Sequence, residues 1–179
     1  MSEAEPQVAF LRGINVGGKK LVPMAALKKI FEKMGCREVR TVLASGNVRF
    51  TPKDGKLTAK VVEATLEKSL GFEVNVMLRN VSELAKIAKS DPFKGIRIGK
   101  QTRLYVTLLA QKPKRKPRLP YKTPDFPFTI LKVTGGEVLS VLELSPKGGT
   151  LDAMAVLEEQ FGKALTTRNW NTVTKLLAA

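Results

Sequence analysis

The sequence predicts a mixed α+β protein of two subdomains. Strand-like apolar runs and amphipathic helical stretches alternate in the order βαββαβ between residues 7 and 79, which is the split βαβ order of ferredoxin-like domains. Near residue 92 the composition becomes strongly basic, and the second half reads αβββαα. We therefore expect an N-terminal ferredoxin-like subdomain over residues 1–92, and a second, smaller and basic α+β subdomain with C-terminal helices over residues 93–179.

The chain opens with a predicted strand, loop and helix. An apolar run over residues 8–11 predicts the strand, and the glycine-rich residues 12–20 predict a loop. Pro23 suits the first position of a helix, and apolar residues recur at helical spacing until Gly35. The order at this end of the chain is therefore strand, loop, helix.

A hairpin, a second helix and a fourth strand complete the first subdomain. Residues 39–43 and 48–50 favour strands, and the turn between them, residues 44–47, contains Gly and Asn, which tolerate the positive φ angles of a tight hairpin. Residues 58–70 form an amphipathic helical pattern. Alternating apolar residues over 74–79 then predict the last strand.

A short helix and a strand follow. Residues 82–89 have a helical pattern that ends before Asp91-Pro92, because the residue before a proline is pushed out of the helical region. Residues 103–109 predict a strand. Residues 111–127 hold half of the chain's ten prolines, so we expect an extended proline-rich loop without regular structure.

The end of the chain predicts a second hairpin and two helices. Residues 128–133 and 137–144 flank a Thr-Gly-Gly turn. Residues 150–161 form an amphipathic helix that ends at Gly162, and a last helix surrounds Trp170.

Composition excludes several classes of function. The chain has 31 Lys and Arg against 16 Asp and Glu, a formal net charge of +15, no histidine and one cysteine. His-based triads, His proton shuttles and ordinary zinc sites are therefore excluded, and we expect no metal site. The single thiol, Cys36, follows a predicted helix end, where the dipole disfavours a thiolate, so we expect it to be inert. The N-terminus is acidic and no long apolar segment occurs, so we expect a cytoplasmic protein without membrane association.

The glycine-rich loop is the sharpest local motif. Its sequence from Gly13 to Lys20 fits the spacing G-x-x-x-x-G-K, but Lys20 stands where a P-loop needs Ser or Thr to hold Mg²⁺. Pro23 also delays the following helix, so we do not expect a nucleotide hydrolase. Two interpretations stay open: N–H groups beside two lysines favour an anion, or the glycines only accommodate a turn.

Three separated motifs resemble one bacterial family. They are Val-Ala-Phe-Leu-Arg-Gly-Ile-Asn-Val-Gly-Gly from Val8 with Val-Pro-Met soon after, Ser-Gly-Asn-Val from Ser45, and Thr-Thr-Arg-Asn-Trp-Asn-Thr-Val from Thr166. In this order they make the chain, from about Gln7 to Leu177, similar to the family known as domain of unknown function (DUF) 1697. The resemblance implies a two-subdomain α+β fold and no established activity, substrate or catalytic residue. The heavy basic charge and the lysine-rich proline loop depart from the family's pattern.

The signature motifs supply one candidate anion site. The Arg168 segment is a donor-rich edge suited to phosphate or carboxylate, although amides near a helix start also serve as caps. Trp170 shares a helical face with apolar residues, which favours a core anchor over a stacking platform. We hypothesise that the glycine loop, the turn at Ser45 and the Arg168 segment converge in one polar cleft between the subdomains. The candidate ligand-binding residues are Arg12, Gly13, Asn15, Gly17, Gly18, Lys19, Lys20, Ser45, Gly46, Asn47, Arg168, Asn169 and Asn171.

The basic stretch is the strongest signal about partners. No acidic residue occurs between residues 93 and 121, and such a surface attracts polyanions at low salt whatever their sequence. A lysine-rich proline loop is also typical of a soluble connector. Four aromatic side chains lie among these charges and are able to stack on unpaired bases, namely Tyr105, Tyr121, Phe126 and Phe128. Phe126 and Phe128 also suit the core of the hairpin. The candidates for nucleic-acid contact are Arg103, Lys112, Lys114, Arg115, Lys116, Arg118, Tyr121 and Lys122.

The sequence favours a non-catalytic binding module for an anion, either a nucleic-acid backbone or a small phosphorylated ligand, with no cofactor. A second hypothesis is an enzyme acting on a phosphorylated metabolite, with Arg12, Lys19 or Arg168 binding the anion and a lysine or carboxylate moving protons. A third makes the signature motifs purely structural. No paired carboxylates are visible, and Ser45 lacks a nucleophile elbow, so the enzyme hypothesis has less support. The oligomeric state is left open.

Overall fold

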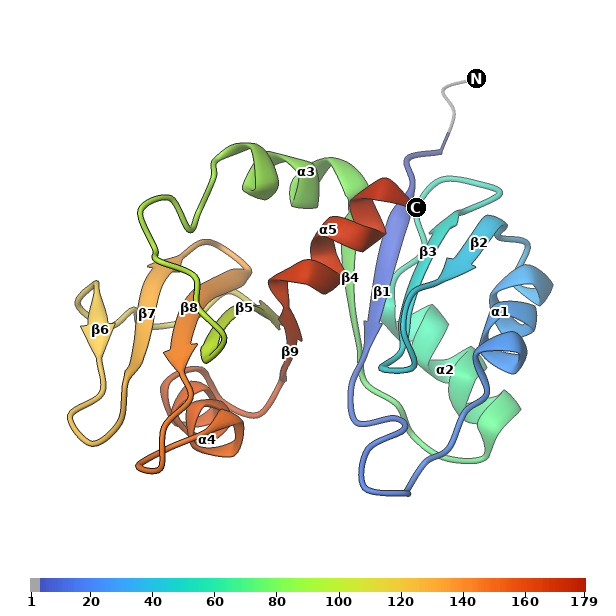
Figure 1. The fold of residues 1–179 in the computed structure, drawn as a ribbon. Coiled ribbons are helices and arrows are strands. Elements are labelled where there is room, and N and C mark those ends of the chain that lie inside the picture. Colours follow the sequence, from blue (N-terminus) through green and yellow to red (C-terminus); the bar gives the residue numbers. More distant parts are fainter. Residues whose placement is uncertain (1–3) are drawn as a thin grey trace. The chain divides into compact units, whose positions relative to one another are not determined.

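The chain folds as a mixed α+β protein with two antiparallel sheets. The computed structural model describes residues 4–179, and these contain five helices, a four-stranded sheet and a five-stranded sheet (Figure 1). The predicted α+β class is confirmed. Residues 1–3, which entered the expectation for the N-terminus, lie outside the described range. Within that range no helix has the length and apolar character needed to cross a membrane.

Two compact units make up the described chain. The first, here called the N-terminal unit, comprises residues 4–87 and 172–179, and the second, called the basic unit, comprises residues 88–171. The boundaries fall inside α3 (Val81–Lys89) and α5 (Trp170–Ala178). The sequence predicted one boundary at residue 92 and a second subdomain that runs to the end of the chain. The structure places the boundary at residue 87, and it assigns residues 172–179 to the N-terminal unit because the last turns of α5 pack there.

The N-terminal unit is built on an antiparallel sheet with the strand order β2-β3-β1-β4. β1 (Gln7–Leu11) pairs with both β3 (Asn47–Thr51) and β4 (Val76–Asn80), and β2 (Arg37–Thr41) extends the sheet beyond β3. Every residue of β1 is buried. This central strand is therefore covered on both faces of the sheet.

Helices α1 (Met24–Lys33) and α2 (Ala59–Leu70) cover one face of this sheet (Figure 1). Leu27 of α1 and Leu66 of α2 belong to one buried cluster with Leu11 of β1. These helices occupy the places expected from apolar spacing, because their buried residues recur at the helical period.

The last turns of α5 lie against the other face. Arg49 of β3 points to that face, because its neighbours Val48 and Phe50 belong to the cluster under α1 and α2. Its guanidinium donates to the carbonyl oxygens of Leu176 (2.8 Å) and Leu177 (3.1 Å). These bonds satisfy carbonyls at the end of α5, where the helix itself supplies no donor.

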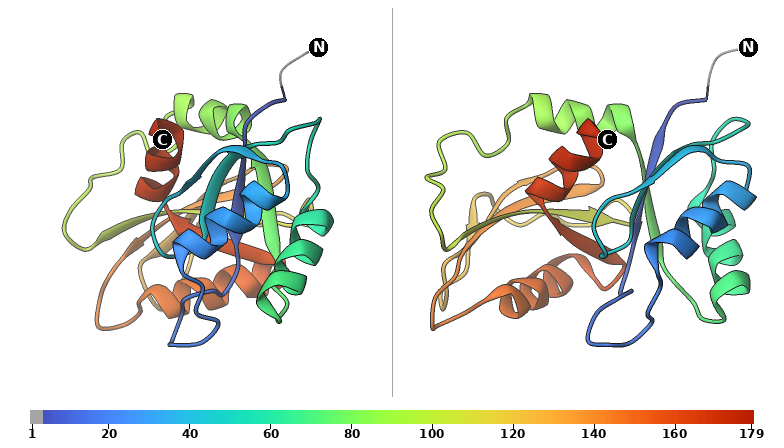
Figure 2. Two further views of the ribbon diagram at one scale, coloured as in Figure 1. Left: turned by 90° about the vertical axis from the view of Figure 1, so that its right-hand side faces the viewer. Right: turned by 45° about the vertical axis from the view of Figure 1, so that its right-hand side comes forward.

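The basic unit is built on an antiparallel sheet with the strand order β6-β7-β8-β5-β9. β5 (Thr102–Leu109) lies between β8 (Glu137–Glu143) and β9 (Leu165–Asn169), and β7 (Phe128–Val133) joins β8 to the short β6 (Tyr121–Lys122). Helix α4 (Thr150–Phe161) covers one face of this sheet (Figure 2). There Ala153 and Leu157 are fully buried in a cluster with residues of β5, β7 and β8.

Two strands of the basic unit depart from the sequence-based expectation. Residues 165–169 form β9 and pair with β5, whereas the sequence pattern predicted only helices after residue 150. Within residues 111–127, where no regular element was expected, Tyr121 and Lys122 pair with β7. β9 pairs with a strand more than fifty residues earlier in the sequence, and β6 is only two residues long, so neither strand is revealed by its own residues.

Candidate anion-binding pocket

The glycine loop folds as a short hairpin of its own. Gly17 and Gly18 have φ angles of 60° and 71°, as the central residues of a type I′ turn require, and Val16 and Lys19 bridge across them. The N–H groups of Asn15 and Lys19 donate to carbonyls within the loop at 3.1 and 3.2 Å. Because these donors are used internally, the loop differs from the phosphate cradle of a P-loop.

The cations of this loop are partly engaged within the N-terminal unit. The Lys20 ammonium donates to the Glu73 carbonyl (2.8 Å) and lies 5.4 Å from the centre of the Phe72 ring. Lys19 is exposed beside it. At the start of the loop, Arg12 is half-buried and Gly13 is exposed with a φ angle of 69°.

The turn between β2 and β3 lies against the glycine loop. The amide nitrogen of Asn15 donates to the carbonyls of Ala44 (2.7 Å) and Val22 (3.0 Å), and its amide oxygen accepts from Val22 N (2.7 Å). Gly46 is buried against Ile14, so that a Cβ on Gly46 would lie 2.7 Å from Ile14 Cδ1. The structure thus brings two of the three predicted segments together.

Asn47 closes the same turn. Its amide nitrogen donates to the Val42 carbonyl (2.8 Å) and to the Ser45 hydroxyl (3.0 Å), and Asn47 is fully buried at the start of β3. Ser45 is exposed. The polar atoms of this motif are therefore engaged in holding the turn.

The third predicted segment belongs to the basic unit. Arg168 is buried in β9, where it donates to the Thr166 hydroxyl (2.7 Å) and the Thr167 carbonyl (3.0 Å). Burial lowers the pKa of its guanidinium to about 10, which leaves it protonated at neutral pH. The Asn169 side chain accepts from Asn171 N (3.0 Å) at the start of α5, as a cap does. The convergence of the Arg168 segment with the glycine loop stays a prediction.

Trp170 packs within the basic unit. Its indole meets Phe93 edge to face, with ring centres 5.4 Å apart and planes inclined by 65°. The indole is half-buried and Phe93 is buried. This contact is typical of a core anchor.

The four aromatic residues of the basic stretch also pack in the core. Tyr105 and Phe128 are buried, and the Tyr105 hydroxyl lies 3.0 Å from the Thr150 hydroxyl. Tyr121 and Phe126 are half-buried against the cluster under α4. None of the four forms an exposed platform for an unpaired base.

The basic unit carries a pocket of about 580 Å³. Among the described residues that line it, four are cationic and none is acidic. The apolar residues Leu109, Phe161 and Ala164, here called the apolar wall, line it too, and the described lining also includes Gln111, Pro113, Gln160 and Gly162. The volume lies within the range of about 300–1,000 Å³ that is typical of small-molecule sites. The four cations are Lys112, Lys114, Arg115 and Lys163.

The pocket forms where the end of β5 meets the start of β9. Ala110 N donates to the Ala164 carbonyl (2.9 Å), which continues the pairing of Leu109 with Leu165. Helix α4 ends at Gly162, whose φ angle of 82° lets the chain turn towards β9. The segment after β5 therefore lies beside the end of α4, although some fifty residues separate them in sequence.

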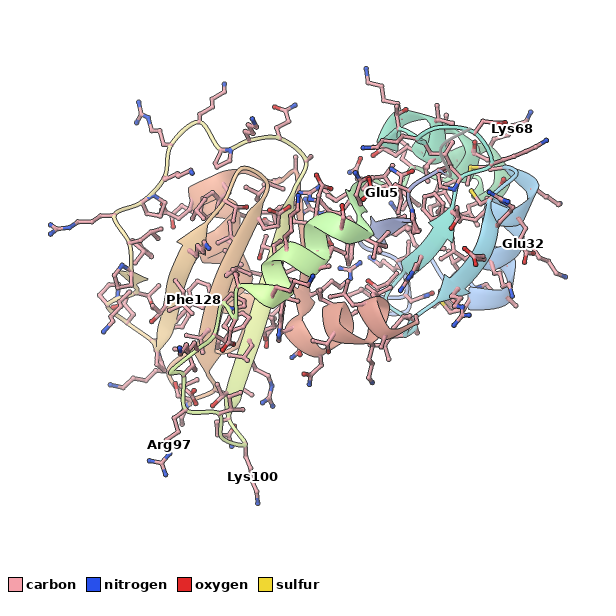
Figure 3. All side chains as sticks on the ribbon, turned by 90° about the horizontal axis from the view of Figure 1, so that it is seen from above. Glu5, Glu32, Lys68, Arg97, Lys100 and Phe128 are labelled. Carbon is pink, nitrogen blue, oxygen red and sulfur yellow. The ribbon has the colours of Figure 1, made fainter. Side chains whose placement is uncertain are left out.

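Three of the eight predicted nucleic-acid contacts line this pocket, namely Lys112, Lys114 and Arg115. Arg103 instead donates to the Lys100 carbonyl (2.8 Å), and Lys116 donates to the Val133 carbonyl (3.4 Å). Arg118 and Lys122 are exposed outside the lining. Figure 3 shows Arg97 and Lys100 extending from the segment between α3 and β5.

Sequence reasoning did not single out the remaining pocket residues. Phe161 is the last residue of α4, and Lys163 follows the helix end. The Gly162 stop signal between them was visible, but their approach to residues 111–115 depends on the pairing of β5 with β9, which was not predicted.

Comparisons with known proteins find relatives whose descriptions assign no function. The family model described as "Protein of unknown function (DUF1697)" matches residues 5–138. The fold is similar to that of a conserved bacterial protein, SP0830, from Streptococcus pneumoniae, with a TM-score of 0.66 and 20% identity, covering 97% of each chain. No curated protein matches the chain.

Proposed function

The chain belongs to the DUF1697 family of proteins of unknown function, and on that premise we propose that it is a non-catalytic module that binds phosphate-rich polyanions. Its ligand in this proposal is the nucleic-acid backbone. The observation that carries the proposal is the pocket of the basic unit, where the lining residues that the structure describes include four cations and no acidic residue.

The charge around the pocket supports this ligand class. The whole chain has a formal net charge of +15, and residues 93–121 contain no Asp or Glu. Exposed lysines gain little from any single contact in water, because salt screens them over about 8 Å at physiological ionic strength. Several of them acting on one polyanion gain through the release of its counterions, which makes binding steeply dependent on salt.

The cations of residues 111–115 carry more weight than Lys163. Lys163 follows the end of α4, where the helix dipole favours a cation in any protein. Lys112, Lys114 and Arg115 come from a segment without helix or strand, so no such local reason accounts for them.

The placement of the aromatic residues favours phosphates over bases. Binding of unpaired bases relies on exposed aromatic faces, whereas Tyr105 and Phe128 are buried and Tyr121 and Phe126 pack against the core. Recognition in this proposal is therefore independent of nucleotide sequence, because phosphate contacts carry no base information.

The signature residues of the N-terminal unit have an architectural role in this proposal. The hydrogen bonds of Asn15 and Asn47 and the close packing of Gly46 on Ile14 support it. We further propose that this unit has the ferredoxin-like arrangement, which the strand order β2-β3-β1-β4 and the two helices on one face support.

The test is the salt dependence of binding to a short labelled single-stranded RNA, followed by fluorescence anisotropy. The triple variant Lys112→Gln, Lys114→Gln, Arg115→Gln is compared with the wild-type chain between about 50 and 200 mM salt. Each phosphate contact on a single strand contributes about 0.7 to the slope of log K against log salt, so we expect the triple variant to lower it by about 2.

A matched control removes the same charge elsewhere. Lys29, Lys60 and Lys68 are exposed on α1 and α2, and their triple substitution by glutamine should leave most of the slope in place. Equal losses in the two triple variants would show that net charge, not the pocket, governs binding. Affinity that ignores salt would contradict the polyanion proposal itself.

A further inference from the structure

We propose that the pocket binds the phosphate end of a nucleotide, with a di- or triphosphate on its cations and the nucleoside against its apolar wall. This inference rests on the proposed function, because the same cations serve both. It adds nucleotides as a ligand class, which net charge by itself does not distinguish from other anions.

The apolar wall is the first observation in favour of a nucleoside. Leu109, Phe161 and Ala164 line the pocket beside the cations. Phe161 is half-buried, with part of its ring held against the cluster under α4. A bare anion gains nothing from these groups, whereas a base or sugar buries apolar surface on them.

The polar lining supports the same ligand. Gln111 and Gln160 lie in the lining with the apolar residues. Each amide offers two N–H donors and one carbonyl acceptor. Bases and ribose hydroxyls present both donors and acceptors, whereas a phosphate only accepts from such groups.

The number of cations indicates more than one phosphate. A terminal phosphate carries about −1.5 to −2 charges at pH 7, and four cations line the pocket. Because the pocket that these cations help to line has a volume of about 580 Å³, it has room for a nucleoside together with its phosphates. A di- or triphosphate thus matches both the charge and the size.

The absence of acidic side chains from the described lining sets the metal preference. Mg²⁺ bound to nucleotides is commonly held by carboxylates as well as phosphates, and within residues 4–179 no Asp or Glu lines this pocket. Mg²⁺ neutralises the phosphates that the cations would contact. We therefore expect the metal-free nucleotide to bind better than its Mg²⁺ complex.

The experiment is calorimetric titration of the full chain with ATP, ADP, AMP and inorganic tripolyphosphate, in the presence of a chelator. Each phosphate removed should weaken binding about tenfold, the usual effect of losing a charge-assisted hydrogen bond. Tripolyphosphate should bind about tenfold more weakly than ATP, because it lacks the nucleoside that buries apolar surface in the pocket. Excess Mg²⁺ should weaken the binding of ATP.

Three variants locate the ligand. Arg115→Gln should weaken ATP about tenfold, whereas Lys147→Gln, which removes an exposed lysine of the same unit outside the lining, should not. Phe161→Leu should lower the affinity for ATP and leave that for tripolyphosphate unchanged. Thermal melts of the variants confirm that each remains folded under the conditions of titration.

Two RNA probes distinguish the sources of the phosphate end. Tighter binding of a short RNA with a 5′-triphosphate than of the same RNA with a 5′-hydroxyl, with competition by ATP, indicates an RNA end. If ATP binds but the two RNAs bind equally, the ligand is a free nucleotide. Both outcomes support a nucleotide phosphate end as the ligand of the pocket. The nucleotide proposal would be overturned if tripolyphosphate bound as tightly as ATP.

The same probes separate this inference from the proposed function. If the 5′-hydroxyl RNA keeps its salt-dependent binding and ATP does not bind, the nucleotide inference fails and the polyanion proposal stands. If ATP binds and the 5′-hydroxyl RNA does not, the polyanion proposal fails and the nucleotide pocket stands.

Discussion

Replacing Gly46 by alanine tests whether the turn between β2 and β3 is locked onto the glycine loop. A Cβ on Gly46 would lie 2.7 Å from Ile14 Cδ1, 2.9 Å from Ile14 Cγ1 and 3.0 Å from Leu11 Cβ. Ile14 is 1% exposed and Leu11 is fully buried, so neither has open space to move into. Gly17 is the matched control, because its φ angle of 60° is also left-handed but a Cβ added there would have nothing within 4 Å.

The difference between the two variants isolates the close packing. Both place alanine at a left-handed φ angle, 78° at Gly46 and 60° at Gly17, which costs about 1–2 kcal/mol. Overpacking adds about 1–3 kcal/mol at Gly46. We therefore expect Gly17→Ala to lower the free energy of unfolding by about 1–2 kcal/mol, and Gly46→Ala by about 2–5 kcal/mol.

Urea unfolding and thermal melts, followed by circular dichroism, measure both losses. In a chain of 150–250 residues each kcal/mol lowers Tm by about 2–4 °C, so Gly46→Ala should melt at least about 2 °C below Gly17→Ala. Equal losses in the two variants would refute the reasoning. Loss of RNA binding in Gly46→Ala at unchanged stability would instead indicate that the turn belongs to a ligand site.

Three further predictions concern two buried groups. Ser140 is fully buried in β8, and its hydroxyl finds no hydrogen-bond partner among the described residues. Ser140→Ala should therefore raise the free energy of unfolding by about 1 kcal/mol, and a lower urea midpoint would contradict this. Burial raises the pKa of Cys36 to about 11 from 9.0, so a thiol reagent at pH 8 should label the folded chain about 100-fold more slowly than the unfolded chain. Because the unfolded thiol ionises first, stability should also fall as the pH rises from about 9 to 11, with a smaller fall in Cys36→Ala.

The helix ends were predictable because their signals are local. α2 begins after Thr58, whose hydroxyl accepts from Val61 N, and ends at Gly71 with a φ angle of 80°. α4 spans residues 150–161 as its apolar spacing and Gly162 predict. Caps and left-handed glycines act within one turn of the backbone, so neighbouring residues are enough to reveal them.

The pairing of β9 was not predictable from its own residues. Leu-Thr-Thr-Arg-Asn has no clear strand alternation, and it becomes a strand because β5 offers an edge to pair with. Across that pair the hydroxyls of Thr107 and Thr167 lie 2.8 Å apart. The packing of the last turns of α5 was likewise not predictable from their own residues, because their carbonyls accept from Arg49, more than a hundred residues away in sequence.

The sequence by itself determined the cationic character of the chain and the segment, residues 111–122, where much of it gathers, because charge belongs to the residues and needs no fold. Only the tertiary structure decided that Lys112, Lys114 and Arg115 share a pocket with Lys163 and an apolar wall. The physical reason is that the pocket requires the end of β5 to pair with the start of β9. Such pairing is set by the packing of a whole sheet against α4, and no short stretch of sequence encodes it.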